Sequence, residues 1–404
     1  FTATTEIYTL TLPDALPIFN LGISGNWGES IYPAGGGFDM QGVHTHSGWW
    51  CGDRYARADF QRWLEAKYGA IGKLNSAWGA SFVDFGQAQP IVPTDATPAR
   101  QAKDQADWYL ESMTDYAEFW VKTCRELYPD LPIYLCTGGD GNPLLGADFA
   151  AQARMCARYD AGIRITNMND DMANGFAITR MVSSATRLYG GYYTTEPGGA
   201  NTPKGVAGRV FDLVAGGARG VYFKMLLQAP PDPGPVGITF MDNARFAISN
   251  KPQLTVAALM PNTSIDLSPG TTNGFLDRAA KLRDALNFEF LDENMIADGL
   301  LDRFKAVVVL AGDMLEAPTL ARLEDWVRAG GVLLMPSDQT PLKDVEGRSA
   351  DWTAASPYSG PPLFKVQFDQ GAPRGLSVDT GGVKKGELTS FWHGAEGRGA
   401  DPTA

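Results

Sequence analysis

The sequence predicts an α/β fold in which a partial (β/α)8 TIM barrel precedes a second, smaller α/β unit. Two observations support this fold class. Short apolar segments alternate with amphipathic helices, which is typical of parallel βα units wound by right-handed crossovers around one sheet or barrel. Five such strands precede a proline-rich segment, at 18–26, 131–138, 161–167, 188–196 and 220–228. A complete barrel has eight strands, so we expect the last five here and about 150 residues missing upstream.

The helices of the first part follow from apolar periodicity. One helix is expected to open at Asp59, with Phe60 and Leu64 on its inner face, and to stop at Gly69. A longer helix is expected over 100–128. Its predicted inner face comprises Trp108, Met113, Tyr116, Trp120, Cys124 and Leu127.

The chain divides into four parts by composition. A proline-rich segment at 229–237 and a turn at 249–253 end the barrel-like pattern. Apolar strands and amphipathic helices beyond them indicate a doubly wound α/β domain. The expected parts are a non-native or disordered lead at 1–17, the barrel at 18–250, the second domain at 251–340 and the start of an incomplete β-rich region at 341–404.

Composition limits the partners of the chain. Its 404 residues are 44% hydrophobic and 20% charged, which suffices for a sizeable core. Lys and Arg number 34 against 46 Asp and Glu, and the net charge of -12 would repel a phosphate backbone or an anionic membrane surface. No run of apolar residues is long enough to span a bilayer. We therefore expect neither nucleic acid nor a membrane as a partner.

Two glutamates at strand ends are the candidate catalytic residues. Glu29 lies in a glycine-rich turn between Trp27 and Tyr32, and Glu196 follows Tyr193 in a second such turn. In a parallel barrel, functional residues project from the carboxyl ends of strands. A glycosidase needs two carboxyls across a sugar, with aromatic faces beside them. A surface loop carboxylate is the common alternative for any single glutamate, but two in matching settings favour a glycosidase.

Polar and aromatic residues near the same strand ends are candidates for substrate binding. Trp49 and Trp50 are either sugar platforms or loop anchors. Asp140, Asn142 and Asn167 could hydrogen-bond sugar hydroxyls, although turn capping is the commoner use of Asn and Asp. The full set is Asn26, Trp27, Tyr32, Trp49, Trp50, Asp140, Asn142, Asn167, Tyr193 and Lys224.

Lys224 and the histidine-rich loop each allow two interpretations. Lys224 lies in an otherwise apolar strand, so it is either inward and functional or a charge at the strand end. His44, His46 and Cys51 could ligate a metal, but further ligands at usual spacing are missing, which favours a plain or substrate-binding loop. We expect no metal and no cofactor.

Several segments resemble one family of enzymes. The stretch DFQRWLEAKYGAIGKLNSAWGASF (59–82) resembles a helix-containing segment of glycoside hydrolase family 42 β-galactosidases. The turn TTEPGG (194–199) resembles the nucleophile turn of that family, and GARGVYFKMLLQ (217–228) resembles its eighth strand. The segments 305–314 and 320–335 are similar to the amidotransferase-like trimerisation domain that follows the barrel there.

The resemblance implies roles for both glutamates. Glu29 would follow strand four as the general acid/base, and Glu196 would follow strand seven as the nucleophile of a retaining double displacement. The substrate would be an oligo- or polysaccharide with β-linked sugars, galactosides first. The second domain would be structural, since it lacks the cysteine nucleophile of an amidotransferase, and it would support a homotrimer.

Two departures keep other interpretations open. Gly28 precedes Glu29, whereas the family usually has Asn there, and the zinc-binding cysteine cluster of the family is absent. The turn GESIYP (28–33) also resembles that of β-amylases, which share the barrel but invert the anomeric centre. The alternatives are therefore an inverting glucan hydrolase of β-amylase type and a non-catalytic carbohydrate-binding or assembly module.

Overall fold

A computed structural model gives the fold of most of the chain. Its described residues are 18–24, 28–33, 48–167, 172–197, 202–221, 234–244, 254–283, 285–336, 340–350, 352, 365–368 and 376–379.

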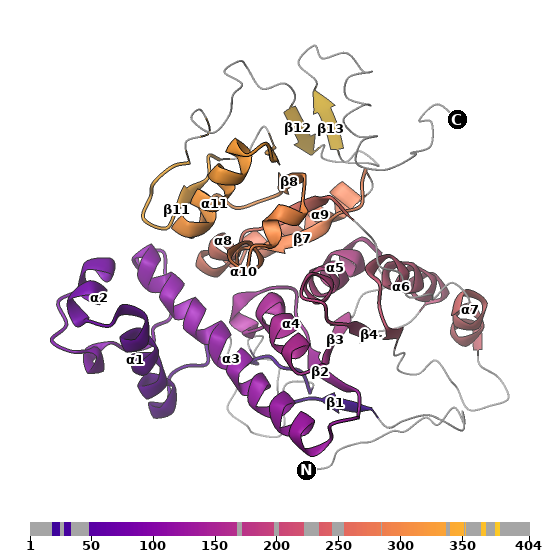
Figure 1. Cartoon of the computed structure of the whole chain (residues 1–404), viewed down its shortest axis with the longest axis horizontal. Coiled ribbons are helices and arrows are strands. Elements are labelled where there is room, and N and C mark those ends of the chain that lie inside the picture. The colour runs from indigo at the N-terminus through magenta and orange to yellow at the C-terminus, as the bar shows by residue number, and fades with distance from the viewer. Residues whose placement is uncertain are drawn as a thin grey trace.

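The first part of the chain forms a parallel sheet of five strands in the order β1-β2-β3-β4-β5 (Figure 1). The strands are β1 (Phe19–Leu21), β2 (Ile133–Thr137), β3 (Gly162–Asn167), β4 (Tyr193–Pro197) and β5 (Gly220–Val221). Each strand pairs with the next in the sequence, as expected for successive βα units. The α/β class and the parallel pairing predicted from the sequence are confirmed.

Helices cover one face of this sheet. They are α3 (Ala99–Leu127), α4 (Phe149–Arg158), α5 (Met172–Leu188) and α6 (Pro203–Gly216), and α7 (Gly234–Ala244) packs against α6. Side chains alternate along a strand, so Ile163 and Ile165 of β3 are buried in the helix-side core. Arg164 and Thr166 consequently lie on the opposite, inner face, where the sheet carries polar side chains.

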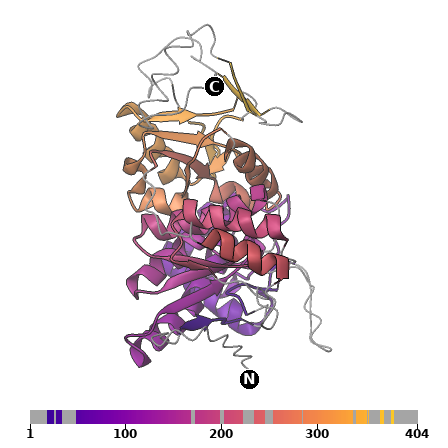
Figure 2. The ribbon, with the colours of Figure 1, turned by 90° about the vertical axis from the view of Figure 1, so that its right-hand side faces the viewer.

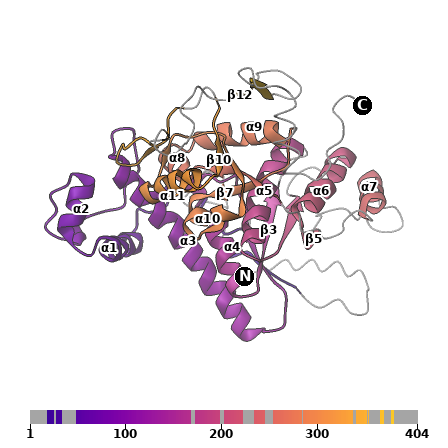
Figure 3. The same ribbon diagram turned by 45° about the horizontal axis from the view of Figure 1, so that its top comes forward.

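Two shorter helices form a second core with α3. Helices α1 (Arg54–Tyr68) and α2 (Ile71–Trp78) project to one side of the molecule (Figure 3). The short helix η1 (Phe85–Gln87) packs against α1. Phe60, Leu64 and Trp78 are buried there against Trp108 of α3. This core is separate from the one behind the sheet.

Two helix predictions need correction. Helix α1 begins at Arg54 rather than at Asp59, because the Asp53 side chain accepts hydrogen bonds from the backbone N–H groups of Tyr55 and Ala56 and caps the helix earlier. The predicted inner face of α3 holds at Trp108 and Met113, which are buried. Further along the same face, Cys124 is partly buried against the core behind the sheet. Three other side chains of the predicted face are instead 38–66% exposed: Tyr116, Trp120 and Leu127.

A second parallel sheet follows, in the order β10-β8-β6-β7. Its strands are β6 (Val256–Met260), β7 (Glu289–Asp292), β8 (Ala306–Val309) and β10 (Val332–Leu334). The helices around it are α8 (Asn262–Leu267), α9 (Thr271–Arg283), α10 (Glu293–Ala297) and α11 (Ala317–Arg328), with the short helix η3 (Leu300–Arg303). Two small pairs complete the described strands: β9 (Met314–Leu315) with β11 (Lys343–Asp344), and β12 (Lys365–Phe368) with β13 (Leu376–Asp379).

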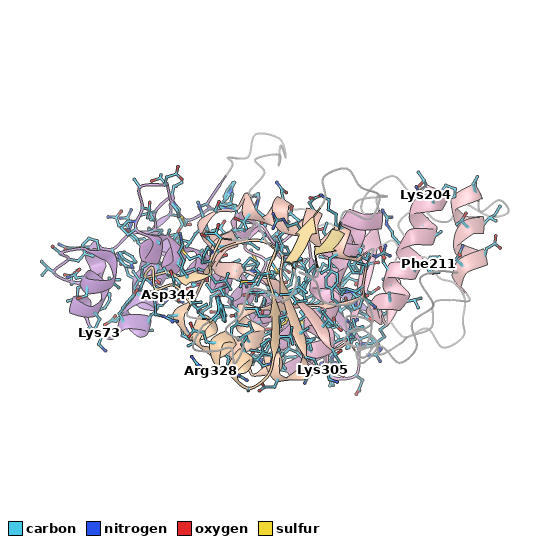
Figure 4. All side chains as sticks on the ribbon, turned by 90° about the horizontal axis from the view of Figure 1, so that it is seen from above. Lys73, Lys204, Phe211, Lys305, Arg328 and Asp344 are labelled. Atoms are coloured by element: carbon cyan, nitrogen blue, oxygen red, sulfur yellow. The ribbon has the colours of Figure 1, made fainter. Side chains whose placement is uncertain are left out.

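The two sheets lie one above the other, with helices of the first unit between them (Figure 2). Helix α5 packs against α9 and β7. Glu289 of β7 is held by Arg187 and by the Ser184 hydroxyl at 2.6 Å, both from α5. Across the direction in which the two sheets are stacked, the molecule is elongated, with Lys73 of α2 and Lys204 of α6 near opposite ends (Figure 4).

A cavity of about 30 Å³ lies at this junction, room for about two water molecules. Asp148, Asp266 and Asp292 are among its lining residues, and Lys103 of α3 reaches Asp266 at 3.2 Å. Among the helices that the structure describes, none combines the length and the apolar character needed to cross a membrane.

Candidate active site

Glu29 lies at the carboxyl end of β2, in the turn that follows β1. The next residue anchors this turn, because the backbone N–H and the hydroxyl of Ser30 both donate to the carbonyl of Cys136, at 2.8 and 2.7 Å. The Ser24 hydroxyl donates to the carbonyl of Glu29 itself. Glu29 is consequently buried, with 6% of its surface exposed.

The first residue after β2 leaves room for the Glu29 carboxyl only because it is a glycine. A Cβ atom on Gly138 would stand 1.8 Å from Oε2 of Glu29 and 2.4 Å from its carboxyl carbon. The carboxyl therefore lies directly against the backbone at the end of β2.

Glu196 projects from the inner face near the end of β4. It lies in register with Thr166 of β3, and its Oε2 accepts from Nη1 of Arg164 at 2.7 Å. Both members of this ion pair are mostly buried, with 13% of the Arg164 side chain and 16% of the Glu196 side chain exposed. Two adjacent strands thus fix the carboxylate of Glu196 on the polar face of the sheet.

The two glutamates interact electrostatically. Burial raises the pKa of Glu29, and the nearby Glu196 carboxylate adds to this rise, whereas Thr166 and Arg164 act against it. A carboxyl that tends to keep its proton beside an ion-paired carboxylate is the arrangement that general acid catalysis requires.

Cys136 of β2 belongs to the same cluster. It pairs with Arg164 in the sheet register, and burial raises its pKa to about 12. A thiol with so high a pKa stays protonated near neutral pH, so it is not suited to act as a nucleophile.

Tyr193, which we expected to bind substrate, faces the other side of the sheet. It is three residues before Glu196, so strand alternation turns it toward the helices. Its ring is 1% exposed and its hydroxyl lies 3.5 Å from the carbonyl of Leu213 in α6. We therefore correct this prediction: Tyr193 is a core residue behind the site.

The polar residues after β2 make turn contacts. The Asn142 side chain accepts from the backbone N–H of Leu144 at 3.0 Å and caps the short helix η2 (Pro143–Leu145). Asp140 accepts from the backbone N–H of Asn142 at 3.3 Å. Turn capping, the alternative use considered for these residues, is thus what the structure shows for them.

The aromatic candidates gather around Tyr109 of α3. The Tyr32 ring stacks on Tyr109 at 4.3 Å and its hydroxyl bonds to Ser112 at 3.0 Å. Trp49 is buried against the edge of Tyr109, and the backbone N–H of Trp50 donates to the Tyr109 hydroxyl at 3.1 Å. Trp49 therefore anchors its loop, the second of the two roles considered for it.

Asn26, Trp27 and Lys224 lie outside the described residues, as do His44 and His46. Asn167 is described only as the last residue of β3, without its side chain. In the described part of the chain, no three His, Cys, Asp or Glu side chains are grouped so that they could hold a metal ion.

The sequence interpretation missed Arg164, Thr166 and Gly138. A signal was available for Arg164, because it is the single charged residue in the strand AGIRITN (161–167). Gly138 and Thr166 carry no such signal, since their roles depend on where the Glu29 turn folds.

Comparisons with known proteins agree with this architecture. The family model of glycoside hydrolase family 42, described as beta-galactosidase, matches residues 43–161. A beta-galactosidase from Arthrobacter sp. is 33% identical over 81 residues, which is 19% of this chain and 12% of the relative. Both Glu29 and Glu196 lie outside the segment matched by the family model.

Two solved structures share the fold over most of the chain. A beta-galactosidase from the haloarchaeon Halorubrum lacusprofundi aligns with a TM-score of 0.57 at 18% identity, over 79% of this chain and 55% of its own. An exo-carrageenase of glycoside hydrolase family 42 from Bacteroides ovatus aligns with a TM-score of 0.60 at 14% identity, over 82% and 56%. The chain thus spans about half the length of these relatives. The segment match and the shared fold confirm the resemblance first seen in residues 59–82: this chain is similar to the β-galactosidases of glycoside hydrolase family 42.

Proposed function

We propose that the chain is part of a glycoside hydrolase that cleaves β-linked sugars in the manner of a β-galactosidase. Glu29 serves as the general acid/base and Glu196 as the nucleophile. The observation that carries this proposal is the pair itself: a buried carboxyl whose pKa is raised lies within electrostatic reach of an ion-paired carboxylate on the same polar face.

The chemistry follows from the different surroundings of the two carboxyls. Glu196 attacks the anomeric carbon while Glu29 gives its proton to the leaving oxygen, which forms a glycosyl-enzyme. Glu29, now ionised, takes a proton from water as the water attacks the same carbon, and Glu196 leaves. Two displacements return the original anomeric configuration.

The wider architecture belongs to the same proposal. The five parallel strands are the last five of a (β/α)8 barrel, and the second sheet is the structural domain through which a homotrimer forms. The successive pairing of β1 through β5 supports the proposal that these strands belong to a barrel. The trimer is checked by measuring the mass of the protein in solution by light scattering.

Replacing either glutamate tests the catalytic assignment. We expect Glu29→Gln and Glu196→Gln to lower kcat on an aryl β-galactoside by about 10²–10⁴-fold, because each change removes a proton-transfer group or the nucleophile. Glu65→Gln, at an exposed position of α1, is the matched control and keeps full activity. Equal activity in all three variants would exclude both roles.

Azide and the product anomer separate the alternatives. Azide should restore turnover to Glu196→Ala of a retaining enzyme, with formation of a glycosyl azide. An inverted product without azide rescue would instead indicate the β-amylase type. Sugar binding without hydrolysis by the unaltered protein would indicate a carbohydrate-binding module.

A further inference from the structure

The guanidinium of Arg164 interacts with both carboxyls of the candidate active site. Arg164 of β3 is in register with Cys136 of β2 and Thr194 of β4, so its side chain starts one pleat below Glu196 on the inner face. From there Nη1 reaches Oε2 of Glu196 at 2.7 Å. The positive charge of Arg164 also acts on Glu29, the second carboxyl of the pair.

The contacts of Arg164 with the two carboxyls are unequal. It makes a direct ion pair with Glu196 but affects Glu29 through space, and burial has the larger influence on Glu29. An ion pair with 13% and 16% side-chain exposure is poorly screened by solvent, so it holds its geometry and its charge effects are strong. Arg164 therefore fixes the position of the Glu196 carboxylate, whereas on Glu29 it acts only by lowering the pKa.

We infer that Arg164 is the positioning residue that fixes the Glu196 carboxylate for attack and limits its repulsion of Glu29. The inference rests on the proposed function of these two glutamates. Without Arg164, two carboxyls on one low-dielectric face would compete for a proton, and the division into a proton donor and a nucleophile would weaken. Arg164 itself does not have to touch the sugar for this role.

Two variants separate charge from geometry. Arg164→Met removes the charge and the fork of donors, whereas Arg164→Lys keeps the charge and loses the planar fork. Arg154→Met, which removes a surface ion pair with Asp298, is the matched control. The first readout is the titration of isotope-labelled glutamate carboxyls by NMR, with the Glu29 signal assigned through Glu29→Gln.

We expect the Glu29 carboxyl to titrate at higher pH in Arg164→Met than in the unaltered protein, because a positive charge that lowers its pKa is gone. Arg164→Lys should shift it much less, and Arg154→Met should not shift it. This measurement needs no turnover. An unchanged Glu29 titration in Arg164→Met would overturn the inference even if the enzyme proved to be a β-galactosidase.

Kinetics give the second readout. On an aryl β-galactoside, both Arg164 variants should lower kcat about 100-fold, because small misplacement of a reacting group has an effect of this size. KM should change by less than kcat, and the basic limb of the pH profile should move upward in Arg164→Met alone. An inverted product would reject the proposed retaining function, whereas full kcat in both variants would reject the role of Arg164.

Discussion

Gly138 shows how one missing methyl group can determine the position of a functional carboxyl. Alanine at this position would place its Cβ within 2.9 Å of three atoms of the Glu29 carboxyl group. The carboxyl is the mobile end of its side chain, so it would swing away while the strand stays in place. We expect Gly138→Ala to lower kcat on an aryl β-galactoside about 100-fold with little loss of stability.

A second glycine provides the control for this prediction. At Gly191, before β4, the nearest atom to a new Cβ is the Thr186 carbonyl oxygen at 3.5 Å, an ordinary contact. Gly191→Ala should therefore retain kcat. If the Gly138→Ala variant instead has a clearly lower Tm and an unchanged kcat, the close packing of Glu29 on the backbone has no catalytic importance.

Individual residues differ in how far the sequence alone could place them. The proximity of Glu29 and Glu196 could be predicted because strand ends, glycines and aromatic neighbours are local features, whereas their catalytic roles stay predictions. Tyr193 was misassigned for a local reason as well, since its distance of three residues from Glu196 fixes opposite faces. Gly138 could not be found, because the turn that fills its space comes from more than 100 residues earlier in the chain.

Among the elements, α1, α2 and α3 meet at one buried carboxylate. Asp104 of α3 has no exposed surface and accepts from the Tyr68 hydroxyl at 2.5 Å, Nε1 of Trp78 at 2.7 Å and Nζ of Lys67 at 2.9 Å. Three donors from two helices thus converge on a single side chain, and the second core closes around it.

We expect Asp104→Leu to destabilise this part of the molecule by about 3 kcal/mol, because buried donors lose their acceptor. The midpoint of urea unfolding measures the effect. Asp302→Ala removes an exposed ion pair with Arg322 and should change stability by less than about 0.5 kcal/mol. Equal midpoints in the two variants would contradict the role of Asp104 as a common anchor.

Element boundaries depended on caps, and helix faces depended on neighbours. The periodicity of α1 was visible from Phe60 onward, but the helix starts where Asp53 caps it, one turn before the apolar pattern begins. Periodicity also marked an apolar stripe along α3, yet only its first half meets α1 and α2. Contact partners distant in the sequence decide which part of such a stripe is buried.

For the whole molecule, the junction between the two sheets should respond to pH. Burial raises the pKa of Asp292, at the end of β7, to about 8, and Asp148 of the first unit adds to the rise. The folded protein therefore holds a proton that the unfolded chain releases above about pH 4. The contribution of Asp292 to the free energy of unfolding should therefore fall as pH rises from about 4 to 8, by at most about 1.4 kcal/mol per pH unit.

Asp292→Asn isolates this effect, because Asn can still cap α10, as Asp292 does through the backbone N–H of Met295. Thermal unfolding between pH 5 and about pH 9 should show a smaller loss of Tm in the variant than in the unaltered protein. Parallel curves of Tm against pH for the two proteins would show that unfolding releases no proton from Asp292 in this range.

The order of elements was the most predictable property of the molecule. Alternating strands and helices already implied sequential parallel pairing, because crossover connections restrict the topology. The junction was not predictable, since its charged partners, Lys103 with Asp266 and Arg187 with Glu289, look like ordinary surface residues in the sequence. Only their burial between two units shows that they hold the molecule together.

Cys136 makes the candidate site observable in the absence of any substrate. Its thiol is 1% exposed and protonated near neutral pH, so an alkylating reagent reaches it only during brief separations of the strands around Glu29 and Arg164. The rate of alkylation of Cys136, followed by mass spectrometry, therefore reports how often the inner face of the sheet opens locally. A sugar held between the two glutamates would lower the rate at which Cys136 is alkylated.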